Sequence, residues 1–398
     1  SQWVCTVLSS LRRHGITAFT IAGGPHPTFF PEFIQTEGLD AINIGEGEGA
    51  LVELADCVEH GREVTNIQNL NVKHNGTVHK NPLRPLVDIN TLPPPDRTIY
   101  LKYEKFRRQR FYNFLVSRGC HFSCSYCFVH KWRDIYQDDQ YHRQARLRDI
   151  DLIIKEIKQV ATLVDIKQID FSDSTFNLDK KWTIQFLKSY TEHIQLPFMI
   201  SIRPNLLTEE VVKAIANTQY CAAVRIGVEV GNEKNRSQVL KKNITNAQIY
   251  RATDLLKRYK VKVFCYTMYG IPGETFDEAS ETITMMQKID PDYVGAHIFK
   301  PYPGMEITKK AMADGYVTAQ NVSLLGKEEQ YQYFHSVLQQ PELLQTINLM
   351  KVSYVAIHFP RLWPLLKRVA RIPVAWPFTI IYSLSNLILL IRYIKISR

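Results

Sequence analysis

Hydrophobic and polar positions in the first 85 residues follow the periods of alternating helices and strands. Helical spacing predicts amphipathic helices at 4–15 and 50–61, each ending at a glycine, and a shorter helix at 31–38. Residues 18–28 predict a strand that runs into a Gly-rich turn, and residues 39–49 predict a second strand that ends in glycines. This alternation indicates a doubly wound α/β segment, in which loops at the carboxyl ends of parallel strands hold ligands.

The same segment is short of strands. Residues 69–82, "NLNVKHNGTVHKNP", predict a hairpin with Asn-Gly at its turn. Two parallel strands alone would not be stable, and the chain begins with Ser rather than Met. We therefore expect residues 1–85 to be the later part of a Rossmann-like domain whose earlier strands precede Ser1.

Residues 86–112 predict a linker, since "LPPPDRTIYLKYEKFRRQR" is Pro-rich and then basic and aromatic. From 113 to 310, six strands alternate with helices of 3.6-residue period, some with a capping residue such as Thr208. This predicts a partial (β/α)6 relative of the eight-fold barrel, whose chemistry lies on loops after the strands. The strand candidates are "FYNFLVS", "IKQIDFS", "PFMISIR", "AAVRIGVEV", "VKVFCYTMYG" and "DYVGAHIF".

Residues 311–398 predict a helical region with a hydrophobic, basic tail. Residues 372–391 carry no charge over about the length that spans a bilayer. Two prolines and Asn386 weaken a spanning helix, whereas "PRLWPLLKRVAR" just before it is typical of an interfacial helix. We expect peripheral or re-entrant membrane contact through 361–398. The alternative is a buried helical cap over the barrel.

Composition narrows the class of protein. The net charge of +10 comes from the tail, because residues from Leu343 onward contain eight Lys or Arg and no Asp or Glu. The remainder is nearly neutral, which argues against nucleic acid as a partner. Seven cysteines and no N-terminal signal peptide indicate a reducing cytoplasm with a metal site.

Three of those cysteines, Cys120, Cys124 and Cys127, are clustered in "SRGCHFSCSYCFVH" on the loop after the first barrel strand. Thiolates are the usual ligands of iron–sulfur clusters, and three of them leave one iron of a four-iron cluster open to an exogenous ligand. The alternative is a zinc site completed by His121 or His130.

This motif, with Tyr126 before its last cysteine, resembles that of radical S-adenosylmethionine (SAM) enzymes. Five later segments resemble the strand-end motifs of that superfamily in the same order. The resemblance implies a [4Fe-4S] cluster on the three cysteines, whose open iron chelates SAM, and one-electron cleavage to methionine and a 5′-deoxyadenosyl radical. The segments are "IDFSDSTFNLD", "SIRPN", "VRIGVEVGN", "YGIPGET" and "KPYPGME".

The resemblance also implies which residues hold SAM. Asp173 would contact its amino group, Arg203 its carboxylate, and Glu229 a ribose or amino group. Glu229 pairing with Arg225 or Arg203, and Arg203 pairing with Asp173, are the structural alternatives, and "GIPGE" is also plausible as an ordinary strand-to-helix turn. The implied SAM residues are Tyr126, Asp173, Arg203, Gly227, Glu229, Gly270 and Gly273.

The N-terminal segment resembles the second half of the cobalamin-binding domain that precedes the barrel in one large radical SAM subgroup. The resemblance implies cobalamin contacts from Gly23, Gly24, Gly45 and Glu46. The first half of that domain has no counterpart before Ser1, so we expect cobalamin binding in a longer protein.

The resemblance thus predicts a cobalamin-dependent methyltransferase acting on an unactivated carbon of a small, lipophilic substrate, with flavodoxin or ferredoxin as electron donor. An oxidative cyclase of the porphyrin-ester type is the first alternative. A non-catalytic, membrane-associated metal-binding module is the second. We expect the protein in the cytoplasm, associated with the cytoplasmic face of the membrane.

Overall fold

The computed structural model describes residues 2–136, 145–324 and 336–385. These residues form two compact units, one containing 2–91 and 130–136 and the other containing the rest. The boundary falls inside the predicted linker 86–112, where the chain forms two one-turn helices, α4 (Thr98–Leu101) and α5 (Glu104–Arg107). The assignment of 86–112 as a linker stays a prediction.

The first unit is a four-stranded sheet in the order β1-β2-β3-β4, in which β1 and β2 are parallel and the other pairs antiparallel. The central strand β2 buries Ala41 in the cluster formed with α3 and Ile42 in the cluster formed with α1 and η1. Helices therefore cover both faces, as a doubly wound segment requires. The elements are α1 (Gln2–Arg13), β1 (Ile21–Ala22), α2 (Pro25–Phe29), η1 (Pro31–Gln35), β2 (Ala41–Asn43), α3 (Glu48–Glu59), β3 (Leu70–His74), β4 (Thr77–Lys80) and α6 (Lys131–Ile135).

The predicted hairpin is present. Asn75 and Gly76 join β3 to β4 with φ of 49° and 76°, the left-handed pair that a two-residue turn of this kind needs. The Gly-rich turn expected after β1 differs from the structure, because Pro25 starts the short helix α2 directly after Gly24. Proline is compatible with a first helical position, since its missing N–H has no partner there.

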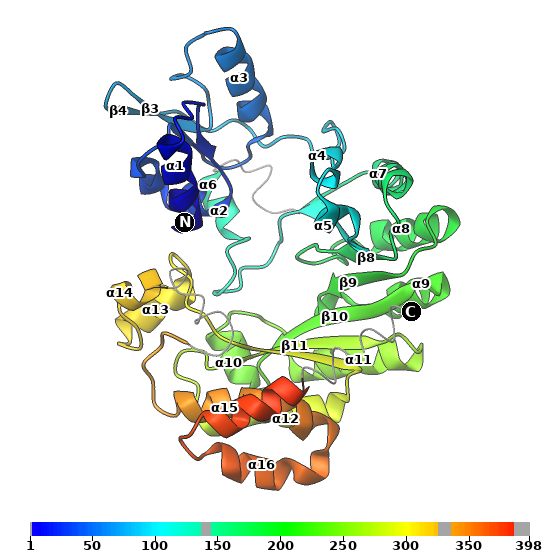
Figure 1. Cartoon of the computed structure of the whole chain (residues 1–398). Coiled ribbons are helices and arrows are strands. Elements are labelled where there is room, and N and C mark those ends of the chain that lie inside the picture. The colour runs from blue at the N-terminus through cyan, green and yellow to red at the C-terminus, as the bar shows by residue number, and fades with distance from the viewer. Residues whose placement is uncertain (1, 137–144, 325–335, 386–398) are drawn as a thin grey trace. The chain divides into compact units, whose positions relative to one another are not determined.

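The second unit contains six parallel strands in the order β5-β8-β9-β10-β11-β12, which confirms the partial (β/α)6 barrel (Figure 1). All six strand candidates are strands, and helices separate them along the chain. The elements are β5 (Phe111–Phe114), β6 (Ser117–Arg118), β7 (Arg146–Leu147), α7 (Ile150–Leu163), β8 (Gln168–Phe171), α8 (Lys180–His193), β9 (Phe198–Ile202), η2 (Pro204–Leu206), α9 (Glu209–Thr218), β10 (Cys221–Glu229), α10 (Glu233–Gln238), α11 (Asn246–Arg258), β11 (Val263–Tyr269), α12 (Phe276–Ile289) and β12 (Tyr293–Ile298).

Local sequence explains where these helices begin. Thr208 accepts a hydrogen bond from Val211 N at the start of α9, as predicted. Thr245 and Thr275 form reciprocal capping boxes with Gln248 and Glu278 at the starts of α11 and α12. Each cap satisfies backbone N–H groups that the first helical turn leaves without partners.

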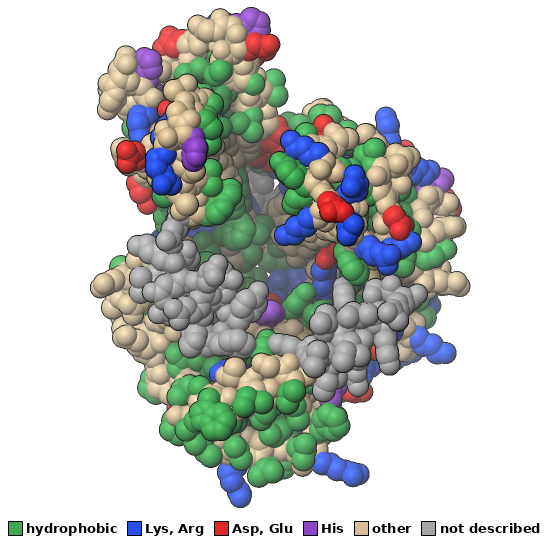
Figure 2. Space-filling view, viewed as in Figure 1, with side chains coloured by type: hydrophobic (Ala, Val, Ile, Leu, Met, Phe, Trp, Pro, Cys, Tyr) green, Lys and Arg blue, Asp and Glu red, His purple; other side chains and the backbone are tan. Residues whose placement is uncertain are grey.

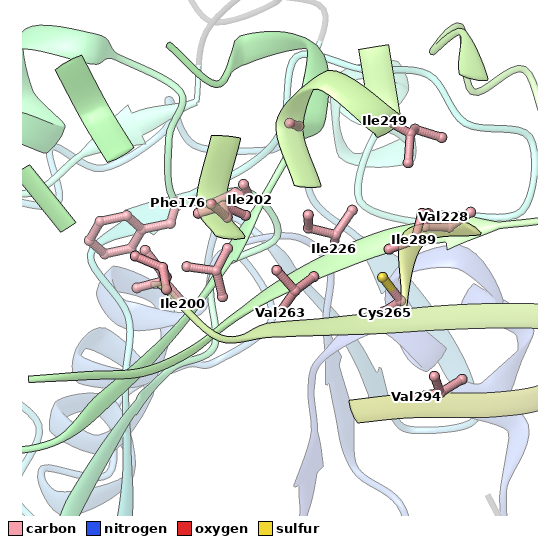
Figure 3. Packing of buried hydrophobic residues seen from close by; sticks show 14 of the residues in the cluster. Phe176, Ile200, Ile202, Ile226, Val228, Ile249, Val263, Cys265, Ile289 and Val294 are labelled. Atoms are coloured by element: carbon pink, nitrogen blue, oxygen red, sulfur yellow. The ribbon is translucent and has the colours of Figure 1, made fainter. Parts of the chain in front are cut away.

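The barrel core lies between the sheet and its helices. Ile200, Ile226 and Val263 come from adjacent strands and meet Ile249 of α11 and Ile289 of α12 in one cluster (Figure 3). Side chains alternate along a strand, so Arg225 of β10 points to the opposite, inner face, where it pairs with Asp170 of β8. The fold thereby separates an apolar outer layer from a polar inner face that carries the candidate site.

The C-terminal region is mainly helical over its described residues, 311–324 and 336–385. The long helix α15 buries most of its residues and packs against α12, β12 and α16. Among the described residues, no helix is both long enough and apolar enough to cross a membrane; residues 386–391 of the uncharged run lie outside them. The elements are α13 (Glu306–Ala313), α14 (Ala319–Leu324), α15 (Leu343–His358), η4 (Pro360–Leu362), α16 (Trp363–Ala370) and a helix at 376–385.

Candidate active site

The three clustered cysteines lie on the loop that leaves the carboxyl end of β5 and β6. Gly119, with φ of 95°, turns the backbone into this loop. Cys127 N donates to Cys124 O at 3.1 Å, and Cys120 Sγ lies 4.0 Å from Thr175 Oγ1 after β8. Burial raises the pKa of the Cys127 thiol to about 11, so a cationic partner such as iron is needed to hold it as thiolate at neutral pH.

Two anchors fix this loop. Asp173, buried after β8, accepts hydrogen bonds from Val116 N, Ser117 N and Ser117 Oγ at the start of the loop. Ser125, between two of the cysteines, donates from Oγ to Val239 O at 2.6 Å and from N to Leu240 O at 3.0 Å. The loop is therefore held at both ends by loops that follow β8 and β10.

The Asp173 carboxyl therefore already accepts hydrogen bonds from the protein itself. Burial raises its pKa, while its hydrogen bonds from Ser117 and Val116 act in the opposite direction. Its predicted contact with the SAM amino group stays a prediction. The structural alternative that paired it with Arg203 does not match the geometry, because the Arg203 guanidinium packs elsewhere.

Arg203 follows β9 and points toward the cysteine loop. Its guanidinium carbon lies 3.5 Å from the ring centroid of Phe122, and Nη1 lies 3.9 Å from Cys124 Sγ. Asn177 exchanges two hydrogen bonds with the Arg203 backbone, at 2.9 and 3.2 Å. Within the described part of the chain, the buried Nε atom has no hydrogen-bond acceptor. An unused buried donor beside a thiol loop suits an anionic ligand.

Glu229 ends β10 in a strained conformation. Its φ is 66°, and the register with β11 shifts between Gly227 and Glu229. Its Oε1 accepts a hydrogen bond from Tyr126 OH at 3.0 Å and lies 2.7 Å from Lys242 Nζ. A non-glycine residue in the left-handed region at a strand end is typical of a functional position. Tyr126, from the cysteine motif, and Glu229 are therefore brought together.

The predicted alternative partners of Glu229 are wrong. Arg225 forms a bidentate pair with Asp170 of β8 on the inner face of the sheet, and Arg203 packs on Phe122. Lys242, which the sequence analysis missed, is the actual cation. It is nearly buried in the loop between α10 and α11, and no motif marks it.

Gly227 makes room for this ion pair. A Cβ at this position would lie 2.5 Å from Glu229 Oε1 and 2.7 Å from Lys242 Nζ. Glycine at this position therefore allows the close approach of two side chains of the protein itself. A direct contact of Gly227 with SAM stays a prediction.

The "GIPGE" segment forms a tight turn from β11 to α12. Gly270 and Gly273 have φ of 72° and 78°. Glu274 Oε2 accepts a hydrogen bond from Gly270 N at 2.7 Å, and burial raises the pKa of this carboxyl to about 8. The turn therefore contains a buried acid whose raised pKa favours the protonated form at neutral pH. The contact of Gly270 and Gly273 with SAM stays a prediction.

A cavity of about 400 Å³ lies at the carboxyl ends of β11 and β12. Tyr126 borders it together with His297, whose pKa is lowered by burial, and with Tyr382 of the helix at 376–385. Burial and the neighbouring Glu229 raise the pKa of Tyr126, so its hydroxyl stays a donor at neutral pH. This cavity is the candidate substrate site.

The predicted cobalamin residues lie together on the loops after β1 and β2. Gly24 has φ of 93°, and no atom lies within 4 Å of a Cβ built on it. At Gly45 such a Cβ would lie 2.1 Å from Tyr136 Oη, and Glu46 N donates to that oxygen at 2.6 Å. The turn at Gly24 is thus open and Gly45 is covered by Tyr136, which the sequence analysis missed. Cobalamin contacts at Gly23, Gly24, Gly45 and Glu46 stay predictions.

The three thiols of the loop are of the ligand type that iron–sulfur clusters use, and their binding of a cluster stays a prediction. Across the described ranges, no group of three or more His, Cys, Asp or Glu side chains is spaced to hold one metal ion. In a four-iron cluster each thiolate binds a different iron, so wider spacing is needed. The loop, its anchors and the adjacent Arg203 fit a cluster that leaves one position for an anionic ligand.

Comparisons with known proteins agree with this geometry. Residues 114–286 match the Radical SAM superfamily. An uncharacterized methyltransferase of Pyrococcus horikoshii is 31% identical over 322 residues, which cover 79% of this chain and 68% of that protein. The anaerobic magnesium-protoporphyrin IX monomethyl ester cyclase of Rubrivivax gelatinosus is 26% identical over 299 residues, covering 71% of this chain and 51% of the cyclase.

Among solved structures, the radical SAM methyltransferase TsrM of Kitasatospora setae, with cobalamin and a [4Fe-4S] cluster bound, superposes with a TM-score of 0.63 at 18% identity. The match covers 79% of this chain and 61% of TsrM, so this chain spans only part of the cyclase and of TsrM. The match with the Pyrococcus methyltransferase extends over two thirds of both proteins. This chain therefore belongs to the radical SAM superfamily, whose cofactors are a [4Fe-4S] cluster and SAM.

Proposed function

We propose that Cys120, Cys124 and Cys127 hold the [4Fe-4S] cluster and that SAM lies between the cysteine loop and the ends of β9 and β10. The observation that carries this proposal is the guanidinium of Arg203, whose Nη1 lies 3.9 Å from Cys124 Sγ while its buried Nε has no acceptor among the described residues. A carboxylate is the natural partner of a guanidinium, because the two planar groups match in charge and shape. The bound cofactors supply reductive cleavage of SAM and a carbon-centred radical.

The remaining residues orient the ligand and exclude water. Glu229 presents a carboxylate at the strand end that accepts hydrogen bonds from hydroxyl or amino groups, and Lys242 and Tyr126 fix its position. Asn177 fixes the backbone of Arg203, and the ring of Phe122 packs against its guanidinium. A preorganised polar site loses little free energy to reordering when the ligand binds.

We propose methyl transfer to an unactivated carbon as the reaction, with cobalamin as methyl carrier. The similarity to the Pyrococcus methyltransferase and to TsrM supports this assignment. Radical cyclisation is the second candidate, supported by the similarity to the Rubrivivax cyclase. We also propose a lipophilic substrate, flavodoxin or ferredoxin as the electron donor, and a location at the cytoplasmic face of the membrane. These interactions would involve surfaces of the protein outside the cysteine loop.

Anaerobic reconstitution with iron and sulfide tests the cofactor assignment. We expect about four irons per chain and formation of 5′-deoxyadenosine when SAM and dithionite are added. Cys124→Ala should abolish both, whereas Cys5→Ala, which removes a half-buried thiol of α1, should retain both. Zinc recovered at one per chain without SAM cleavage would instead establish the non-catalytic metal-binding module.

Methyl-labelled SAM separates the two reactions. In the presence of cobalamin, a methyltransferase moves the label from SAM to cobalamin and then to substrate. A cyclase leaves the label in methionine while 5′-deoxyadenosine accumulates. Retention of all label in methionine, with a reacting substrate, would overturn the methyl-transfer assignment and favour cyclisation.

A further inference from the structure

Exposed apolar side chains gather on the C-terminal part of the second unit. Figure 2 shows hydrophobic side chains clustered at the bottom of the view, with Lys and Arg at the edges. Trp376, Ile380 and Leu384 recur every four residues and form one stripe of the helix at 376–385, where they are 69%, 53% and 58% exposed. The C-terminal apolar surface consists of Phe359, Leu362, Leu365, Ile372, Val374, Trp376, Ile380 and Leu384.

Hydrogen bonds from two side chains of α15 fix the segment that carries this surface. Asn348 of α15 is fully buried, and its Nδ2 lies 3.4, 3.0 and 3.2 Å from the carbonyl oxygens of Ala370, Ile372 and Val374. Lys351 Nζ donates to Thr379 Oγ1 at 2.8 Å from the same helix. Because buried polar groups are costly unless they are paired, these bonds specify the position of the segment.

The inner face of the same segment packs on the core. Phe378 and Ser385 are buried, and Ile381 and Tyr382 pack against the barrel cluster. The helix at 376–385 therefore keeps one face on the protein while its apolar stripe faces outward. Exposed apolar surfaces of this kind usually mark a site where a protein binds a partner or a membrane.

Charge identifies the partner. Arg361 and Arg368 flank the surface along the chain, whereas Lys367 and Arg371 pair with Asp277 of α12. From Leu343 to the C-terminus the chain has eight basic and no acidic residues. A second copy would bring two equally basic surfaces together across a two-fold axis, which costs free energy. We propose that the C-terminal apolar surface seats peripherally in an anionic lipid bilayer, with the stripe among acyl chains and the basic side chains at the phosphates.

The location of the helix gives this contact a consequence, which rests on the proposed function. Tyr382 lines the cavity at the ends of β11 and β12, two residues from Ile380 and Leu384. One helix thus forms both a wall of the candidate substrate site and the surface that would meet lipid. Docking would therefore involve the same helix that borders the cavity.

Vesicle co-sedimentation of the full chain, without SAM, tests the docking. The test variant is Trp376→Ser/Ile380→Ser/Leu384→Ser, and the matched control is Leu51→Ser/Val52→Ser/Val58→Ser, which removes three exposed apolar side chains of α3. We expect wild type and control to sediment with vesicles of equal parts phosphatidylcholine and phosphatidylglycerol, and more weakly with pure phosphatidylcholine. The test variant should partition at least tenfold less, because binding scales with the apolar area inserted.

Equal sedimentation of the test variant and wild type would overturn the proposal, as would a wild type that stays in solution with both vesicles. A wild-type dimer that the test variant converts to monomer, without vesicle binding, would assign the surface to contact between copies. Formation of 5′-deoxyadenosine by the test variant in vesicle-free solution should match wild type. Its loss from both proteins would count against the proposed function and not against the docking.

Discussion

Replacing Lys242 with methionine probes the charge pair at the end of β10. The side chain keeps a similar volume but loses the ammonium that lies 2.7 Å from Glu229 Oε1. The two side chains are only 9% and 15% exposed, so solvent screens the pair weakly. The substitution leaves a nearly buried carboxylate with Tyr126 OH as its remaining side-chain donor.

The magnitude follows from this geometry. Two unit charges 2.7 Å apart attract by about 6 kcal/mol at an effective dielectric constant of about 20, and desolvation offsets much of this. Removing one partner of a buried pair costs about 3–5 kcal/mol. Because Tyr126 still donates to Glu229, we expect Lys242→Met to lower the free energy of unfolding by about 3 kcal/mol.

Urea unfolding of the Lys242→Met, Glu229→Gln and double variants forms the assay. The double variant should be more stable than Lys242→Met, since it no longer buries an unpaired charge. SAM affinity should fall in all three, because each removes or releases the carboxylate at the strand end. A loss below about 0.5 kcal/mol in Lys242→Met, or strictly additive losses, would show that the pair does not hold Glu229 in place.

Three further substitutions test neighbouring parts of the site. Burial raises the pKa of Glu274 to about 8, so the folded protein keeps its proton over a pH range in which the unfolded chain loses it. The free energy of unfolding should therefore fall as the pH rises from 4.5 toward 8, by up to about 1.4 kcal/mol per pH unit. Glu274→Gln should flatten this decline in thermal unfolding between pH 5 and 8. Gly227→Ala puts a Cβ 2.5 Å from Glu229 Oε1 and should cost about 1–3 kcal/mol in urea, a loss that Glu229→Ala partly reverses. An undiminished stability of Gly227→Ala would show that the pair can move aside. Asp173→Asn weakens the acceptors for Val116 N and Ser117 and should cost about 1–3 kcal/mol and reduce iron content; full iron loading would contradict its anchoring of the cysteine loop.

Much of the fold could be predicted because local patterns agree with the tertiary structure. The six barrel strands carry apolar residues at alternate positions, the Thr208 cap starts α9, and Asn75-Gly76 makes its hairpin turn. In each case the period or the turn residue alone specifies the backbone conformation. The helix α2 was missed because Gly24-Pro25 is equally typical of a turn and of a helix start.

The pairing of side chains within the site was not predictable in the same way. Lys242 reaches Glu229 from a loop 13 residues away, and Arg225 pairs with Asp170 across 55 residues. Sequence shows that charged residues lie at strand ends but not which loop folds over which strand. Tyr136 against Gly45, 91 positions apart, was missed for the same reason.

Electron paramagnetic resonance of the reconstituted, reduced protein reports whether SAM binds an iron that the protein leaves open. We expect a [4Fe-4S]⁺ signal that changes shape when SAM is added and that is absent from Cys124→Ala. We also expect a weaker response to SAM in Arg203→Met, whose cluster signal without SAM should be retained. A cluster signal that SAM leaves unchanged in the wild type would contradict the proposed site.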